Sequence, residues 1–229
     1  MKKYDLIIFD ADRTLFDFDK AEKKAIQRIC QDISITYSNE ILKAYQHINH
    51  QFWVDFENGL INQEIIKTER FKKFFEYINC HDDYIEFGDR YLEYLSMGNY
   101  LLKDAYHVVK KLSKNYKLVL LTNGLSKVQF PRFEHSTIKK FFEFIIVSED
   151  VGFQKPDKEI FDLVFDKLDF HDYDRTLMVG DSLTSDIKGG INAKIHTCWY
   201  NIDHREASKV IQPNYTIYKI KDILAILGE

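Results

Sequence analysis

The fold is decided by the stretch Leu6-Ile7-Ile8-Phe9-Asp10-Ala11-Asp12-Arg13-Thr14. Four consecutive apolar residues stop abruptly at an aspartate, without the polar alternation of a half-exposed strand. A short, continuous apolar run of this kind is typical of a strand that is buried on both faces, as in a parallel sheet. We therefore expect residues 4–9 to form a buried strand that carries two carboxylates just beyond its carboxyl end.

Similar apolar runs recur in the second part of the chain and alternate with helical patterns. Strands are expected at residues 117–121 and 176–179, with weaker candidates at 144–147, 197–200 and 214–217. Helices are expected at residues 104–114, 138–142, 158–168, 185–193 and 221–227. This alternation predicts βαβ units with right-handed crossovers. The expected fold is α/β, with a Rossmann-like, doubly wound parallel sheet.

Residues 20–98 follow a different pattern. They contain no proline and no glycine before Gly59, and their apolar residues recur at helical spacing. Such a segment predicts three to four successive helices. We therefore expect two parts: a core made of residues 1–19 and 99–229, and an all-helical cap subdomain, residues 20–98, inserted after the first strand.

Composition excludes several classes of protein. The chain has 229 residues, with 32 Lys and Arg against 36 Asp and Glu, a net charge of −4. This balance argues against a nucleic-acid partner and against a polybasic membrane anchor. The three cysteines are far apart and form no C-x-x-C pair, so reduced thiols are expected. The first apolar run is too short for a signal peptide, and no run is long enough for a membrane span. We expect a cytoplasmic protein.

Polar side chains follow the predicted strands at their carboxyl ends. They are Asp10 and Asp12, then Thr122-Asn123-Gly124, then Lys155-Pro156, and finally Gly180-Asp181 with Asp186. In open α/β sheets, ligands bind beyond these strand ends. Carboxylate oxygens without histidine or cysteine favour Mg²⁺ over zinc. A lysine, a hydroxyl and exposed backbone N–H groups suit a bound phosphoryl group, and an aspartate beside them can attack phosphorus. The second aspartate can act as general acid and base.

These segments resemble, in order, the four motifs of the haloacid dehalogenase superfamily of phosphohydrolases. The quoted motifs are Phe9-Asp10-Ala11-Asp12-Arg13-Thr14-Leu15, Leu121-Thr122-Asn123-Gly124, Lys155-Pro156 and Gly180-Asp181 through Asp186. The helical block looks like the inserted cap of that superfamily, which would close over substrate and set selectivity. Residues 148–157 and 180–193, followed by Thr197-Cys198-Trp199-Tyr200-Asn201, look most like its pyrimidine 5′-nucleotidase branch. N-acylneuraminate-9-phosphatase is also similar.

The resemblance implies a role for each matching residue. Asp10 would be the nucleophile and a metal ligand. Asp12 would be the general acid and base, with its backbone carbonyl on Mg²⁺. Thr122 and Lys155 would hold the phosphoryl oxygens with Asn123 beside them, and Asp181 and Asp186 would bind or support the metal.

The sequence departs from the family pattern at three positions. Arg13 stands where glycine, aspartate or asparagine is usual, so it could contact substrate, contact Asp12 or face solvent. Lys194 replaces a usual glycine, and Pro131 lies inside the helix expected after the second motif. None of these changes removes a catalytic group.

The resemblance implies a Mg²⁺-dependent phosphomonoesterase that works through an aspartyl-phosphate. The expected substrate is a small phosphorylated metabolite, foremost a pyrimidine nucleoside monophosphate such as UMP, dUMP or TMP. Phosphatases of sugar phosphates or of N-acylneuraminate 9-phosphate remain alternatives, as does a phosphomutase. A non-catalytic sensor of a phosphorylated ligand is the alternative from another class, although it predicts a damaged motif and all four are intact. A monomer and a homodimer are both compatible with the sequence.

Overall fold

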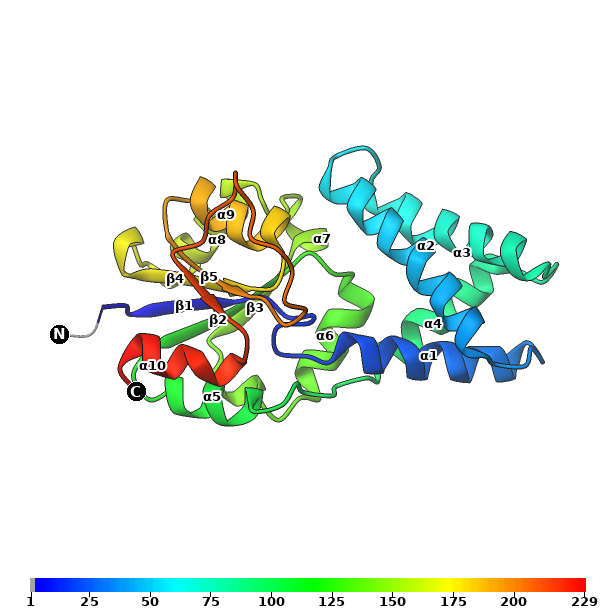
Figure 1. Ribbon diagram of the computed structural model, residues 1–229, viewed down its shortest axis with the longest axis horizontal. Coiled ribbons are helices and arrows are strands. Elements are labelled where there is room, and N and C mark those ends of the chain that lie inside the picture. The colour runs from blue at the N-terminus through cyan, green and yellow to red at the C-terminus, as the bar shows by residue number, and fades with distance from the viewer. Residues whose placement is uncertain (1–2) are drawn as a thin grey trace. The chain divides into compact units, whose positions relative to one another are not determined.

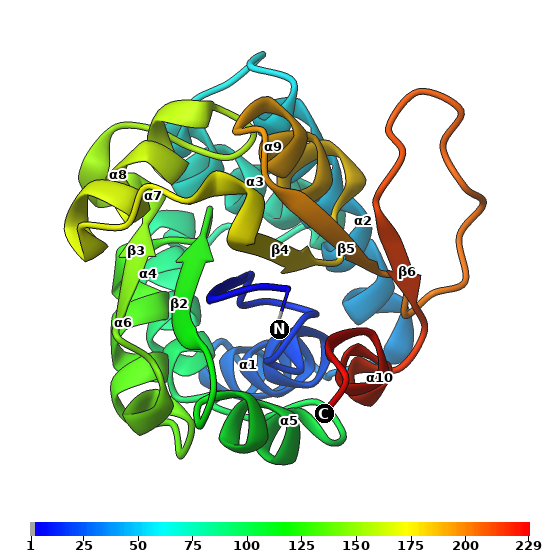
Figure 2. The same ribbon diagram turned by 90° about the vertical axis from the view of Figure 1, so that its left-hand side faces the viewer.

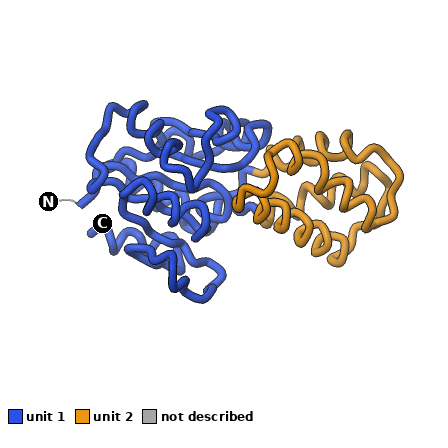
Figure 3. The backbone as a smooth tube through the Cα atoms, turned by 90° about the horizontal axis from the view of Figure 1, so that it is seen from above, with its two compact units in different colours: residues 1–18, 99–229 blue, residues 19–98 orange. Residues whose placement is uncertain are grey.

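The computed structural model describes residues 3–229 and divides into two compact units (Figure 3). The first unit runs to Phe18 and resumes over Asn99–Glu229, and the second is Asp19–Gly98. Met1 and Lys2, which belong to the predicted core segment 1–19, lie outside the described residues. Over residues 3–229, every helix is too short or too polar to cross a bilayer.

The first unit is built on a six-stranded sheet in which every neighbouring pair is parallel (Figure 1). The strands are β1 (Leu6–Phe9), β2 (Lys117–Thr122), β3 (Phe144–Val147), β4 (Thr176–Gly180), β5 (His196–Tyr200) and β6 (Tyr215–Ile217). Their order is β3-β2-β1-β4-β5-β6. The central strand β1 pairs with β2 on one side and β4 on the other. This topology confirms the predicted Rossmann-like, doubly wound sheet.

Six α-helices of the described residues belong to this unit, five before or between strands and one after β6. They are α5 (Ala105–Leu112), α6 (Ser126–Glu134), α7 (Ser148–Val151), α8 (Lys158–Leu168), α9 (Lys188–Asn192) and α10 (Ile223–Leu227). Two predicted helices differ in form. The helix expected at 138–142 is only a 3-10 turn, Lys139–Phe141, whereas the longer helix of that connection is α6. The helix expected at 185–193 begins as a π turn, Leu183–Ile187, and continues as α9.

The sheet is covered on both faces because the side chains of each strand alternate between them. On β1, Ile7 and Phe9 belong to one apolar cluster, which includes buried residues of α5 and α10. Leu6 and Ile8 belong to a second cluster, with buried residues of α8. Figure 2 shows α8 and α9 on one side of the sheet and α5 and α10 on the other. Burial of both faces explains why the strands are apolar without alternation.

The second unit consists of four helices around an aromatic core. They are α1, which begins one residue before this unit (Phe18–Asp32), α2 (Asn39–Glu57), α3 (Gln63–Ile78) and α4 (Tyr84–Ser96). The side chains of Ser38, Asn62 and Asp83 cap the last three helices at their N-termini. Tyr45 lies against Phe71, Phe74 and Tyr91 with ring centroids 5.1–6.1 Å apart. These contacts join α2, α3 and α4.

A chain of polar side chains joins α1 to α2 and α3. The Glu22 carboxylate of α1 accepts hydrogen bonds from Gln46 and Asn49 of α2, both at 2.9 Å. Asn49 in turn accepts a 2.6 Å hydrogen bond from Arg70 of α3. Burial raises the pKa of Glu22 from 4.5 to about 7, against the opposing effect of its hydrogen bonds and of Arg70.

Candidate active site

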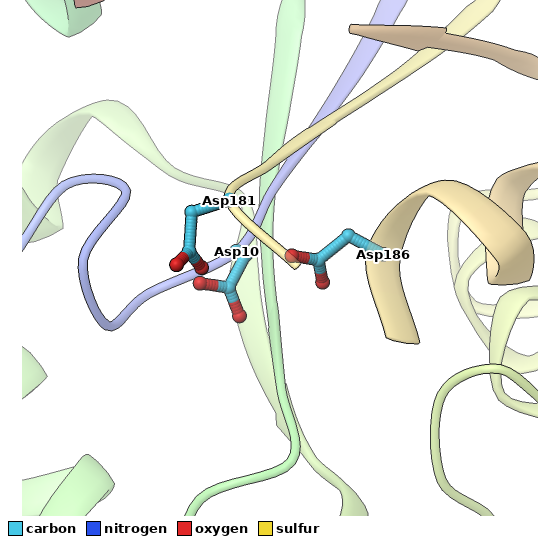
Figure 4. A group of neighbouring side chains, drawn as sticks. All are labelled: Asp10, Asp181 and Asp186. Atoms are coloured by element: carbon cyan, nitrogen blue, oxygen red, sulfur yellow. The ribbon is translucent and has the colours of Figure 1, made fainter. Parts of the chain in front are cut away.

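Three carboxylates meet at the carboxyl end of the sheet, where β1 and β4 lie side by side (Figure 4). Asp10 follows β1, Asp181 follows β4, and Asp186 lies in the π turn just beyond. One ligand oxygen of each lies within 4.8 Å of the others. Adjacent parallel strands place these residues together although they are far apart in the chain.

Glycine at the end of β4 makes room for Asp186. A Cβ atom added at Gly180 would lie 2.2 Å from Oδ2 of Asp186, far inside van der Waals contact. The same oxygen accepts a 3.0 Å hydrogen bond from the backbone N–H of Ser182. The turn after β4 therefore fixes the Asp186 carboxylate, and it does so only while position 180 has no side chain.

A buried lysine neutralises part of this acidic cluster. The Lys155 ammonium donates to Asp10 at 2.7 Å, to Asp186 at 2.6 Å and to the backbone carbonyl of Leu121 at 2.8 Å. These three acceptors match its three protons. The Asn123 side chain holds the loop that carries it: its amide donates to the Lys155 carbonyl, and its Oδ1 accepts from the Lys155 N–H, each at 2.8 Å. A cis peptide bond follows, between Lys155 and Pro156.

The electrostatics of the cluster fit a bound divalent cation. Burial raises the pKa of Asp10 to about 7, although Lys155 opposes the shift, and burial with the Asp10 and Asp186 charges raises the pKa of Asp181. The two partner carboxylates raise the pKa of Lys155 against the effect of burial. Lys155 contacts two of the three carboxylates, and the Arg13 guanidinium lies 3.6 Å from the third, so three carboxylates face two cations and a negative excess remains. Hard oxygen ligands with such an excess suit Mg²⁺ or a similar ion.

Asp12 and Thr122 lie at the ends of β1 and β2, and their side chains bond outside the three-carboxylate cluster. The Asp12 carboxylate accepts a 2.6 Å hydrogen bond from Gln129 and pairs with Arg132, both on α6. The Thr122 hydroxyl accepts from the N–H of Gly124 at 3.1 Å. The structure thus gathers Asp10, Lys155, Asp181 and Asp186, sets Asn123 beside Lys155, and directs the Asp12 carboxylate to α6.

Arg13 lies beside this cluster, in the left-handed backbone conformation (φ 60°). Its guanidinium bonds Asp203 at 2.6 Å, and its Nε lies 3.6 Å from the Asp181 carboxylate. The structure thus gives Arg13 contacts with two aspartates, one of them in the cluster.

Sequence reasoning missed several residues that support the site. Trp199 and Arg205 both donate to the backbone carbonyl of Asp181, Trp199 at 2.9 Å. Gln129 and Arg132 hold Asp12. The one available signal was the polarity of Gln129 and Arg132, which stand beside Val128 and Phe133 on the apolar face of a short helix. Nothing in the local sequence around Asp203 or Arg205 indicates their contacts.

Comparison with known proteins gives the family. The model of the haloacid dehalogenase-like hydrolases matches residues 7–200, which include every residue of the site described above up to Trp199. The chain belongs to the haloacid dehalogenase-like hydrolase family. The predicted superfamily is thereby confirmed, and the protein is a hydrolase.

Three relatives match along nearly their whole length. The chain is 36% identical to the HAD-hydrolase YfnB of Bacillus subtilis over 228 residues, which cover 100% of this chain and 97% of that protein. It is 35% identical to the pyrimidine 5′-nucleotidase YjjG of Escherichia coli, with 98% of each chain covered. It is 32% identical to the pyrimidine 5′-nucleotidase PynA of Streptococcus pneumoniae, with 99% and 96% covered. The predicted likeness to the pyrimidine nucleotidase branch is confirmed.

A solved structure of the family also matches the fold. The crystal structure of Bacillus subtilis YfnB bound to magnesium aligns with a TM-score of 0.94 and 35% identity, covering 100% of both chains. A 2-haloacid dehalogenase structure from Pseudomonas syringae aligns with a TM-score of 0.69 at 20% identity, a likeness of fold alone.

Proposed function

We propose that this hydrolase is a Mg²⁺-dependent phosphomonoesterase whose nucleophile is Asp10. The observation that carries the proposal is the buried contact of Lys155 with Asp10 and Asp186, next to the third carboxylate, Asp181. A carboxylate can attack a phosphate dianion only where positive charge offsets the repulsion. The excess of carboxylates over lysine implies that further positive charge comes from a metal ion.

In the proposed reaction, an Asp10 oxygen bonds to phosphorus as the bond from phosphorus to the leaving oxygen breaks. The protonated Asp12 carboxyl gives its proton to that leaving oxygen. In the second step, Asp12 takes a proton from water as the water oxygen bonds to phosphorus. The bond between phosphorus and the Asp10 oxygen breaks, which releases phosphate and restores the Asp10 carboxylate. Thr122 and Lys155 bind phosphoryl oxygens, with Asn123 holding the Lys155 loop.

Asp10, Asp181 and Asp186 would hold the metal ion through side-chain oxygens, together with the backbone carbonyl of Asp12. The ion would supply positive charge that lowers the repulsion between carboxylate and phosphate. A magnesium-bound relative with 35% identity supports this choice of metal.

The proposed substrate class is the pyrimidine nucleoside 5′-monophosphates. Two relatives with 35% and 32% identity along nearly their whole length are named pyrimidine 5′-nucleotidases. The segments 148–157 and 180–193 support the same branch. The same relatives support a small phosphorylated substrate. A cytoplasmic location and the lack of nucleic-acid or membrane partners stay predictions from composition.

Phosphate release with Mg²⁺ tests the proposal across UMP, dUMP, TMP, purine monophosphates, sugar phosphates and N-acylneuraminate 9-phosphate. We expect the highest kcat/KM for the pyrimidine monophosphates and no turnover in Asp10→Asn. Release from sugar phosphates alone would keep the mechanism and exclude the nucleotidase assignment. Binding of these ligands without any turnover by the wild type would favour the sensor alternative.

A further inference from the structure

Two buried side chains of α6 hold the Asp12 carboxylate from one side. Gln129 Nε2 donates to Oδ2 at 2.6 Å, and Arg132 Nη1 donates to Oδ1. Gln129 is 2% exposed and Arg132 is 0% exposed. We propose that Gln129 and Arg132 are positioning residues, which fix the Asp12 carboxyl in the orientation that protonates the leaving oxygen. This inference rests on the proposed function, in which Asp12 is the general acid.

The spacing of the two donors suits this task. They are three residues apart on α6, so both side chains leave the same face of the helix. Because each takes a different oxygen, the carboxylate cannot rotate without breaking one of the two contacts. Each oxygen also keeps a second lone-pair position, and the side chain is 26% exposed, so Asp12 can still carry and pass on a proton.

Arg132 is placed for its contact with Asp12 rather than for stability. Its Nε and Nη2 are buried and have no hydrogen-bond partner among the described residues, and its guanidinium lies 5.7 Å from the centre of the Phe16 ring. Burial of an arginine with a single carboxylate partner is a weak way to stabilise a fold, because desolvation offsets most of the attraction. The hydrogen bond from Arg132 Nη1 to Asp12 is therefore the contact that explains why this arginine is buried here.

Gly124 of the second motif makes the Gln129 contact possible. A Cβ atom at position 124 would lie 2.2 Å from Gln129 Nε2 and 2.9 Å from Gln129 Cδ. The absence of a side chain after Asn123 therefore opens the path by which Gln129 reaches Asp12. We infer that Gly124 helps to position Asp12, because it leaves room for the Gln129 side chain that bonds the Asp12 carboxylate.

Leaving-group chemistry separates positioning from a structural role. The 5′-hydroxyl of a nucleoside is a poor leaving group and needs a proton as it departs, whereas p-nitrophenolate leaves without one. The value of kcat/KM reports the first irreversible step, here the transfer of the phosphoryl group to Asp10. A mispositioned general acid should therefore lower kcat/KM for UMP and spare p-nitrophenyl phosphate. A distorted site would lower both equally.

The first test compares Gln129→Leu and Arg132→Lys with the wild type on these two substrates. We expect Gln129→Leu to lower kcat/KM for UMP by about 10- to 100-fold and for p-nitrophenyl phosphate by less than about threefold. Arg132→Lys keeps the charge but loses the fixed geometry of the guanidinium, so it should show the same selective loss, smaller than that of Arg132→Met. Phe130→Leu, at an exposed position on α6, is the matched control.

The second test is a double-mutant cycle. If Gly124→Ala acts by displacing Gln129, it should produce the same selective loss for UMP. The double variant Gly124→Ala/Gln129→Ala should then be no worse than Gln129→Ala alone. Additive losses would instead show that the glycine acts independently of Gln129.

The outcomes distinguish failure of the positioning role from failure of the proposed function. Equal losses on both substrates, or unchanged kinetics in folded Gln129→Leu and Arg132→Lys, would overturn the positioning role and leave the proposed function intact. A wild type that releases phosphate from no monoester would overturn the proposed function, and this inference with it. If the wild type prefers another alkyl phosphate over UMP, that substrate takes its place in the comparison. Thermal unfolding of each variant identifies any that fail to fold.

Discussion

Two residues that depart from the family pattern occupy left-handed backbone conformations. Arg13 has φ 60° and Lys194 has φ 58°. Both stand where glycine is common in proteins of the haloacid dehalogenase superfamily. Glycine adopts this conformation without the strain that a Cβ atom causes. At Arg13 the contacts with Asp203 and Asp181 compensate for the strain. Lys194 is exposed, and the ion pairs of the described residues include none with it.

Relief of this strain gives a prediction for Lys194→Gly. The substitution should raise the free energy of unfolding by up to about 1 kcal/mol, because the strain removed exceeds the added entropy of the unfolded chain. Lys194→Ala is the control, since it removes the same charge and keeps the Cβ atom. Urea denaturation measures both, and a glycine variant less stable than the alanine variant would contradict the explanation.

A side chain at position 180 should weaken metal binding. In Gly180→Ala the new methyl group must displace the Asp186 carboxylate, which a Cβ atom would approach to 2.2 Å. We expect the apparent Kd for Mg²⁺ to rise by about 10-fold or more, as for other changes around metal ligands. The Mg²⁺-dependent increase in Tm measures this without reference to activity. An unchanged Mg²⁺ response in a folded variant would show that Asp186 does not support the ion.

Among the elements, the end of β2 is joined to the loop that carries Lys155 by the side chain of Asn123. Asn123 makes two 2.8 Å hydrogen bonds to the Lys155 backbone and so joins segments 32 residues apart. Asn123→Ala should lower kcat by about 10- to 100-fold, because Lys155 loses its fixed position, and should cost about 1–2 kcal/mol of stability. The same substitution at exposed Asn115 should leave turnover unchanged. Normal kcat in Asn123→Ala would refute the role of this contact.

The helical unit gives a prediction about pH. The folded state raises the pKa of Glu22 from 4.5 to about 7, so between these values the folded state holds a proton that the unfolded state has released. The stability that Glu22 contributes is therefore fully present below about pH 4.5 and is lost as pH rises through about 7.

Glu22→Gln removes this pH dependence. Relative to the wild type, the variant should gain stability between pH 5 and pH 8, by on the order of 2–3 kcal/mol. Denaturant unfolding at both pH values measures the change, with Glu93→Gln, an exposed carboxylate on α4, as control. A constant difference between variant and wild type across this range would exclude a titrating Glu22.

At the scale of the whole molecule, the sheet explains which site residues the sequence could predict. Asp10, Lys155, Asp181 and Asp186 directly follow apolar strands or the turns beyond them, and parallel strands deliver such residues to one edge. The periodicity of residues 20–98 likewise predicted their helices. These features depend on local pattern and on the topology that the pattern implies.

Other contacts depend on side chains that reach across the fold, so no local pattern reveals them. Arg13 pairs with Asp203, 190 residues away, and Arg132 reaches Asp12 from 120 residues away. The prediction of a helix at 138–142 was wrong. Only a single 3-10 turn forms there before β3, and α6 supplies the helix of this connection.

Acid quenching during turnover shows whether Asp10 receives the phosphoryl group. Mass spectrometry of the wild type with Mg²⁺ and UMP should find one base-labile phosphoryl group on the peptide that contains Asp10. Asp12→Asn should accumulate the same species from p-nitrophenyl phosphate, because it lacks the base that activates water. Asp10→Asn should show neither phosphorylation nor turnover. Near-normal turnover by Asp10→Asn, or wild-type turnover without a phosphorylated Asp10, would contradict the account.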